Sequence, residues 1–112
     1  MFIRFLGAGL LESAYEECLC HELKLRDMDF ERQKSLPLTY KEVALDCGFR
    51  IDVLVSNSVV VEIKAVESLK PVHEAQFLTY LKLGGWKLGL LINFNVAVLT
   101  NGIKRVVLGF NE

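Results

Sequence analysis

The sequence has little of what marks secreted, membrane-spanning or zinc-binding proteins. Its 112 residues include three cysteines, Cys18, Cys20 and Cys47. A Cys-x-Cys pair is not a usual zinc spacing, and an iron–sulfur cluster would require a fourth thiolate. We therefore expect reduced thiols that lie mostly in the core, and a cytoplasmic protein.

Long apolar runs and an excess of one charge are also missing. No apolar stretch approaches the ~18 residues of a membrane span, and residues 1–11 make a poor signal peptide. The formal net charge of −1 gives no overall attraction for nucleic acid, so such binding would depend on local patches. Hydrophobic residues make up 52% of the chain, enough for the core of one domain over residues 1–112.

The most informative pattern lies in residues 49–64. Two runs rich in β-branched residues flank Ser56-Asn57-Ser58, which predicts a β-hairpin. If the turn is centred on Asn57, Asp52 stands opposite Glu62, with Cβ atoms roughly 4.5–5.5 Å apart. The two carboxylates would repel each other unless a divalent cation lay between them. Lys64 would share the face of Glu62, whereas a one-residue slip in register would separate Asp52 from both.

Residues 10–27 have the periodicity of a helix, with Gly9 as a plausible N-cap. Two adjacent apolar rows are candidates for its buried side: Ala14, Cys18, His21 and Leu25, and Leu11, Tyr15, Leu19 and Leu23. Glu12 shares a helix face with Tyr15. Two interpretations of Glu12 stay open, a carboxylate that caps the helix and a catalytic group, and the residues alone favour the cap.

A second helix is predicted from Pro71 to about residue 83, because Pro suits the first turn and Gly84-Gly85 ends the pattern. Its candidate buried residues are Val72, Ala75, Leu78 and Leu81. Another row holds His73, Gln76 and Tyr80, for which a surface position and a functional one are equally good interpretations.

The remaining segments predict strands. Residues 30–40 are extended around Pro37, residues 41–47 form a turn and a short strand, and residues 86–93 form a strand buried on both faces. Strand 59–65, helix 71–83 and strand 87–92 then make a parallel strand–helix–strand unit. Asn101-Gly102 predicts a C-terminal hairpin of residues 96–100 and 103–108.

In this order the motifs resemble the GxxExxY family, a group within the PD-(D/E)XK nuclease superfamily. The match covers nearly everything after Leu6. It rests on Gly9, Glu12 and Tyr15; Tyr40-Lys41; Arg50-Ile51-Asp52; Glu62-Ile63-Lys64-Ala65-Val66; His73-Glu74-Ala75-Gln76 with Tyr80-Leu81-Lys82; Gly89-Leu90-Leu91-Ile92-Asn93-Phe94; and Gly102-Ile103-Lys104-Arg105.

The resemblance implies an α/β (α+β) fold with a restriction-endonuclease-like αβββαβ core, a mixed sheet flanked by helices. It implies hydrolysis of phosphodiester bonds in DNA or RNA with Mg²⁺ or Mn²⁺. Asp52, Glu62 and the carbonyl of Ile63 would bind the metal. Lys64 would orient water or stabilise phosphate charge, and Glu12 would complete the catalytic set.

Substrate contacts are implied as well. Gln76 and Tyr80 match the Gln-x-x-x-Tyr element of RecB-type nucleases, and His73 and Tyr15 join them as expected substrate-binding residues. Similar proteins usually carry a further helix before the Gly-x-x-Glu motif, which this chain lacks as a sequence pattern. We therefore expect apolar surface that is covered in a homodimer or a larger homo-oligomer.

Two other functions remain open. A nucleic-acid-binding or assembly module would keep the fold and the metal without useful turnover. A structural domain would pair Asp52 with Arg50 or Lys64, but it gives Glu62 no purpose within a hydrophobic strand.

Overall fold

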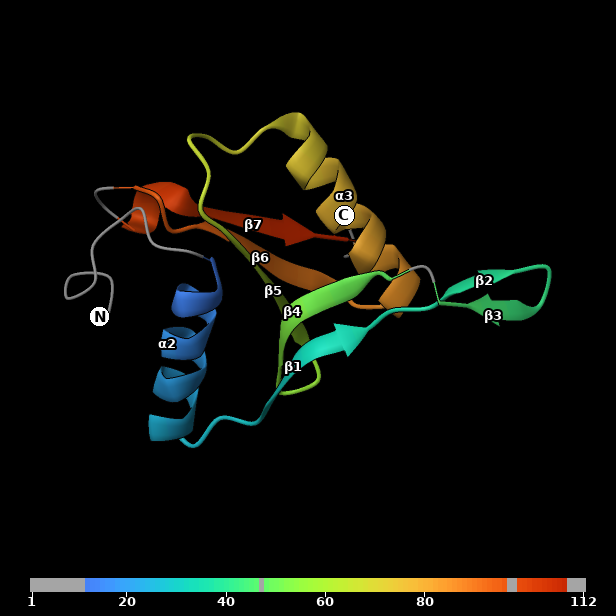
Figure 1. The fold of residues 1–112 in the computed structure, drawn as a ribbon, viewed down its shortest axis with the longest axis horizontal. Helices are drawn as coiled ribbons and strands as arrows, with labels where there is room; N and C mark the ends of the chain where they lie inside the picture. The colour runs from blue at the N-terminus through green and yellow to red at the C-terminus, as the bar shows by residue number, and fades with distance from the viewer. Residues whose placement is uncertain (1–11, 47, 97–98, 109–112) are drawn as a thin grey trace.

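The fold is an α+β arrangement of two long helices and a central sheet (Figure 1). The computed structural model describes residues 12–46, 48–96 and 99–108. The elements run in the order α2 (Glu12–Leu25), β1 (Phe30–Ser35), β2 (Leu38–Tyr40), β3 (Val43–Leu45), β4 (Arg50–Val55), β5 (Val59–Lys64), α3 (Pro71–Gly84), β6 (Leu88–Asn93), the 3₁₀ helix η1 (Leu99–Gly102) and β7 (Ile103–Val107). Within these ranges no helix is long and apolar enough to cross a membrane.

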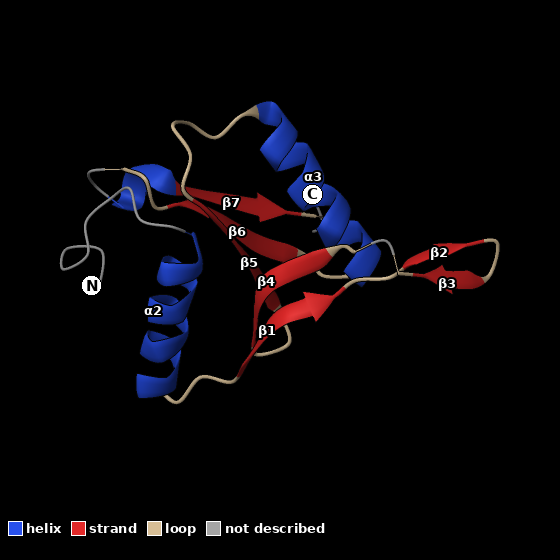
Figure 2. Ribbon diagram, in the orientation of Figure 1, coloured by secondary structure: helices blue, strands red, loops and turns tan. Residues whose placement is uncertain are grey.

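The central sheet is mixed and has the strand order β1-β4-β5-β6-β7. β5 and β6 run parallel and are joined through α3, whereas the other neighbours are antiparallel. With the short β2–β3 ribbon set aside, the described chain reads α2, β1, β4, β5, α3, β6, so the predicted αβββαβ core is confirmed. The β2–β3 ribbon projects beyond the end of the main sheet (Figure 2).

Helix α2 covers one face of the sheet. Tyr15 and Leu23 pack there against Val53 and Ile63, and the ring of Tyr15 stacks on Phe94 at a centroid distance of 4.7 Å. Of the two predicted apolar rows, the one with Tyr15, Leu19 and Leu23 faces the sheet, whereas Leu25 is 66% exposed. The proposed N-cap Gly9 lies outside the described residues, as does any helix before α2.

Helix α3 covers the opposite face, and of its predicted buried residues only Leu81 is fully buried. Leu78 is half-buried, and Val72 and Ala75 are exposed. Phe77, Tyr80 and Leu81 face the sheet, whereas Val72 is 65% exposed. Close packing occurs at Gly89 of β6, where an added Cβ would lie 2.5 Å from Cζ of Phe77. Apolar residues surround much of α3, so periodicity alone did not identify the face that β6 admits.

The C-terminal strand β7 forms where it was predicted, but the predicted hairpin partner is wrong. β7 pairs antiparallel with β6, from Leu88 opposite Val107 to Ile92 opposite Ile103. Residues 99–102, expected to form a strand end and a two-residue turn, form the 3₁₀ helix η1 instead. Strand β6 offers β7 backbone partners from Leu88 to Ile92, and this tertiary pairing overrides the local Asn-Gly signal.

Candidate active site

The site lies where the β4–β5 hairpin opens. Ser56 and Asn57 both have positive φ, as a tight turn requires, and Val53 pairs with Val61 in the predicted register. The ladder ends at that pair, so Asp52 is the first β4 residue beyond it. Its carboxylate fills the opening, because Oδ2 accepts a hydrogen bond of 2.7 Å from the N–H of Ile63.

Glu62 is almost fully buried beside Asp52. Burial first, and then the negative charge of Asp52, raise the pKa of Glu62 to about 7, while Lys64 acts in the opposite direction. Its Oε2 lies 3.6 Å from Nζ of Lys64. Its Oε1 is buried and has no hydrogen-bond partner among the residues that the structure describes. A buried carboxylate oxygen without a donor is costly and is a natural place for a cation.

Asp52 stands opposite Gln33 of β1, at an irregular point of the sheet. The register of β1 with β4 is the same on both sides, but Gln33 has a φ of +50°. In a regular strand, residues two apart such as Ile51 and Val53 point to the same face. Here Ile51 packs with α3 and Val53 with α2, so β4 is irregular at Asp52, between them. Burial raises the pKa of Asp52, whereas the Ile63 N–H and the Gln33 amide act to lower it.

Glu12, in the first turn of α2, reaches the same place from another element. Its Oε2 accepts a hydrogen bond of 3.1 Å from the N–H of Ala65, just beyond Lys64. Glu12 and Asp52 line one cleft of about 340 Å³, together with Ser13, Glu16, Gln33 and Ile63. The structure therefore brings Glu12, Asp52, Glu62 and Lys64 together from α2, β4 and β5.

A polar network behind Asp52, centred on the buried Glu16, was not predicted. Oε2 of Glu16 accepts hydrogen bonds from Arg32 at 2.8 and 3.1 Å, and its Oε1 accepts one of 2.7 Å from Gln33. The same Gln33 amide lies 3.4 Å from Oδ1 of Asp52. Arg32 thus neutralises Glu16, and Gln33 connects that pair to Asp52. The only signal in the sequence is the spacing of Glu12 and Glu16 by one helical turn.

The expected substrate-binding residues fall into different places. Nε2 of Gln76 donates a hydrogen bond of 3.0 Å to the hydroxyl of Tyr80, whose ring lies 5.8 Å from that of Phe49, just before β4. Gln76 is exposed and Tyr80 is 8% exposed. Tyr15 is fully buried in the α2 cluster, so its position offers packing rather than a surface for a ligand.

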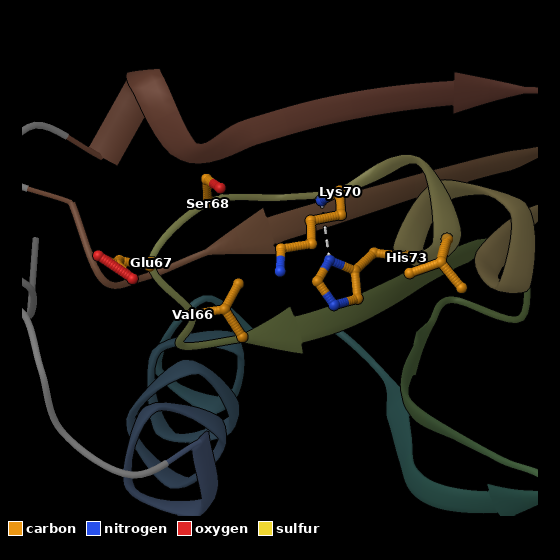
Figure 3. Close-up of a pocket in the computed structure, with 6 residues that line it drawn as sticks. Val66, Glu67, Ser68, Lys70 and His73 are labelled. Atoms are coloured by element: carbon orange, nitrogen blue, oxygen red, sulfur yellow. Dashed lines mark hydrogen bonds between the residues drawn. The ribbon is translucent and has the colours of Figure 1, made fainter.

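His73 lines a separate hollow at the start of α3. This hollow, of about 680 Å³, is bounded by Val66, Glu67, Ser68, Lys70, Val72 and His73. Figure 3 shows the side chain of Lys70, on the loop that follows β5, beside that of His73, in the first turn of α3. Nδ1 of His73 accepts a hydrogen bond of 2.9 Å from the N–H of Lys70. In its neutral form the ring therefore carries its proton on Nε2.

The donors present fit a hard divalent cation. Two carboxylates and the Ile63 carbonyl are oxygen ligands of the type that Mg²⁺ and Mn²⁺ prefer. Oε1 of Glu62 has no hydrogen-bond donor among the described residues, and a cation could take the place of that donor. Within the described ranges no group of three or more His, Cys, Asp or Glu side chains has the geometry of a metal centre.

Comparison with known proteins agrees with this geometry. The family model of the PD-(D/E)XK nuclease superfamily matches residues 2–106, and the chain belongs to that superfamily. Its members are generally hydrolytic nucleases that typically use divalent metals. No curated protein and no solved structure matches the chain significantly.

Proposed function

We propose that the chain is a metal-dependent nuclease that hydrolyses phosphodiester bonds of DNA or RNA with Mg²⁺ or Mn²⁺. The observation that carries the proposal is the pair of the half-buried Asp52 and the buried Glu62 at the opening of the hairpin, with a Glu62 oxygen that has no partner in the described structure and with Lys64 adjacent. Asp52, Glu62 and the Ile63 carbonyl would hold the cation. When bound, the cation would stabilise phosphate charge and lower the pKa of a bound water.

The side chains around the pair have separate roles in this proposal. Lys64 supplies a fixed positive charge for the phosphoryl oxygens without occupying a ligand position. Glu12 completes the catalytic set, holding the Ala65 N–H and lining the cleft beside Asp52. Ionisation of Glu62, whose pKa is about 7, would be favoured near neutral pH by a cation that replaces its missing donor.

The substrate strand would extend from the cleft toward α3. Gln76 and the Tyr80 hydroxyl are proposed contacts, and the hollow with Lys70 and His73 provides an ammonium and an N–H for backbone phosphates. Tyr15 would act indirectly, by packing on Phe94 and so holding α2 on the sheet. The Gly9, Glu12 and Tyr15 spacing supports membership of the GxxExxY group, and Gln76 with Tyr80 supports a RecB-type element.

The test is a Mg²⁺ or Mn²⁺ titration followed by melting temperature, beside a cleavage assay on single- and double-stranded DNA and RNA. A cation that binds only the folded state should raise the melting temperature, and cleavage should require it. Asp52→Asn should abolish cleavage and leave the metal-free protein as stable as before or slightly more so. Glu74→Gln, an exposed change on α3, is the matched control.

Three outcomes would contradict parts of the proposal. If neither cation changes the melting temperature, the metal site is wrong. Cleavage that survives Asp52→Asn would show that the site lies elsewhere. A melting shift without cleavage of any substrate would favour the alternative of a nucleic-acid-binding or assembly module that keeps the metal but lacks turnover.

A further inference from the structure

The end of β5, which carries Glu62 and Lys64, is held by side chains from three different elements. Asp52 of β4 accepts a hydrogen bond from the N–H of Ile63, and Glu12 of α2 accepts one from that of Ala65. The third anchor is Asn93, the last residue of β6, whose Oδ1 accepts a hydrogen bond of 3.0 Å from the N–H of Val66. The first two anchors belong to the proposed catalytic set, whereas Asn93 does not.

Asn93 hydrogen-bonds both the N–H and the carbonyl of Val66, and we call this pair of bonds the clamp. Its Nδ2 donates a hydrogen bond of 2.9 Å to the Val66 carbonyl, while its Oδ1 also accepts one of 3.2 Å from the N–H of Asn95. The residue is 3% exposed, so these bonds are shielded from water. Replacing Asn93 would leave the Val66 N–H without its partner and would leave the Val66 carbonyl with only the longer bond of 3.3 Å that it accepts from Nδ2 of Asn95, which is costly.

The side-chain amide of Asn93 continues the hydrogen bonding of β5 beyond the last residue of the β5–β6 ladder. The backbone ladder of β5 with β6 runs as far as Lys64 opposite Asn93, followed by a hydrogen bond of 2.8 Å from the Phe94 N–H to the Lys64 carbonyl. A side-chain amide carries the same donor and acceptor as a peptide group. Asn93 therefore supplies one more rung, and β5 stays ordered just past Lys64.

The neutral charge of Asn93 distinguishes it from the other two anchors. If Asp52 binds a cation, part of its negative charge is taken up by that cation, and its hydrogen bond to the Ile63 N–H weakens. Glu12 is exposed, so its bond to Ala65 competes with water. The Asn93 amide neither titrates nor competes for a hard cation as a carboxylate does, so its two bonds to Val66 persist in both states.

We propose that Asn93 is a positioning residue that keeps the Ile63 carbonyl and the Lys64 side chain in place when the site is loaded. The inference rests on the proposed function for its catalytic consequence. Its structural part, the clamp on Val66, stands independently and has a readout without metal.

The experiment compares Asn93→Ala and Asn93→Leu with the wild-type chain. Asn93→Leu fills a similar volume without hydrogen bonds, so it serves if the alanine variant does not fold. Ile92→Val is the control for general loss of stability, because Ile92 is a buried neighbour on β6 that makes no clamp. Three properties are measured: amide hydrogen exchange at Val66, Mn²⁺ binding by calorimetry, and kcat and KM on the DNA or RNA substrate that the wild-type chain cleaves.

Both Asn93 variants should show faster exchange at the Val66 amide without metal, and Mn²⁺ binding weaker by about ten- to a hundredfold, as for groups that orient metal ligands. The value of kcat should fall while KM changes little, since the substrate contacts are elsewhere. Ile92→Val should change none of these beyond its effect on melting temperature. In the wild-type chain, Mn²⁺ should alter exchange at Ile63 more than at Val66.

Unchanged Val66 exchange in folded variants would show that Asn93 makes no clamp. Faster exchange with wild-type Mn²⁺ affinity and kcat would show a clamp that does not position the site. If the wild-type chain bound no Mn²⁺, the proposed function would fail, and with it the catalytic part of this proposal; Val66 exchange would then decide the clamp alone.

Discussion

The two ends of the β4–β5 hairpin differ both in backbone pairing and in the chemistry of their side chains. At the turn end, Val53, Leu54 and Val55 pair with residues 59–61 in a regular ladder, and their side chains enter the two cores. At the open end, Asp52 and Glu62 would form the next pair, but the ladder has stopped. There the Ile63 N–H is satisfied by a carboxylate, and one Glu62 oxygen has no donor in the described structure.

This difference shows how the fold divides stability and function along one element. The turn end fixes the register, and the register alone places the two carboxylates opposite each other. At the open end burial, and after it the neighbouring negative charge, raises the pKa of both acids, a cost that the turn end must offset. Variants at the two ends should therefore affect different measurements.

The largest effect on stability is expected at the turn end. Leu54 is 1% exposed, and Leu54→Ala should lower the free energy of unfolding by about 2–5 kcal/mol, through lost apolar contacts and a cavity. Urea unfolding measures this loss, and the rise in melting temperature with Mn²⁺ should remain. Leu45→Ala on the exposed β2–β3 ribbon should cost much less. An equal cost at both positions would contradict the contrast between core and ribbon.

At the open end, Lys64→Ala should act on turnover. Removing the Lys64 ammonium from beside the phosphate should slow cleavage by about a hundred- to a thousandfold. The Mn²⁺ affinity, measured by calorimetry, should stay within a few fold of the wild-type value. Lys82→Ala removes an exposed charge from α3 and should have little effect on either. A loss of Mn²⁺ affinity as large as the loss of turnover would mean that Lys64 organises the metal ligands instead.

Glu62→Gln should make the metal-free chain more stable at high pH. The folded pKa of Glu62 is about 7, above its ordinary value of 4.5, so stability present below pH 4.5 is lost as the pH rises through 7. The variant avoids this loss, which amounts to at most about 3 kcal/mol at pH 8. The net gain is smaller, because glutamine pairs more weakly with Lys64 than glutamate does.

Urea unfolding at pH 4.5 and pH 8 measures the difference. Glu74→Gln, an exposed acid on α3, should show no such pH-dependent gain. In the wild-type chain, saturating Mg²⁺ should recover much of the stability lost at pH 8. A Glu62→Gln gain that is the same at both pH values would show that packing, not ionisation, explains it.

Gln33 tests how the open end is supported from β1. Both Gln33→Ala and Gln33→Gly remove the amide that contacts Glu16 and Asp52, but glycine tolerates the φ of +50° better. The glycine variant should therefore be more stable than the alanine variant by about 1 kcal/mol in urea unfolding. Either variant should raise the pKa of Asp52 further, because a donor to its charged form is lost. Equal stability would show that the backbone there is not strained.

The smallest effect on folding is expected from self-association. The β2–β3 ribbon exposes Tyr40, Val43 and Leu45, and we expect a homodimer or a larger homo-oligomer at high micromolar concentration. Light scattering should give a mass above that of one chain, and Val43→Glu should lower it toward the monomer. A monomer mass for the wild-type chain at that concentration would contradict the prediction.

Local patterns predicted much of this arrangement, because two features depend only on nearby residues. The turn at Asn57 set the β4–β5 register and hence the positions of Asp52 and Glu62, and Pro71 with Gly84-Gly85 bounded α3. The Gln33–Asp52 contact depends on β1 pairing with β4 across the intervening β2–β3 ribbon, which no local pattern specifies. Likewise, the buried face of α3 is selected by the sheet beneath it, so Phe77 and Tyr80 replaced Val72 and Ala75.

Gly89 has a consequence that reaches beyond packing. The ring of Phe77 occupies the space where any other residue would carry its first side-chain carbon. The absence of a side chain at Gly89 thereby lets α3 pack close to β6, and this short distance also determines where Gln76 and Tyr80 of α3 lie. The separation between the proposed substrate contacts and the carboxylates on the neighbouring strands is thus set by a residue that belongs to neither group. An alanine at position 89 would force the Phe77 ring out of this position and disturb the contact of α3 with β6, although residue 89 touches neither the carboxylates nor the proposed substrate contacts.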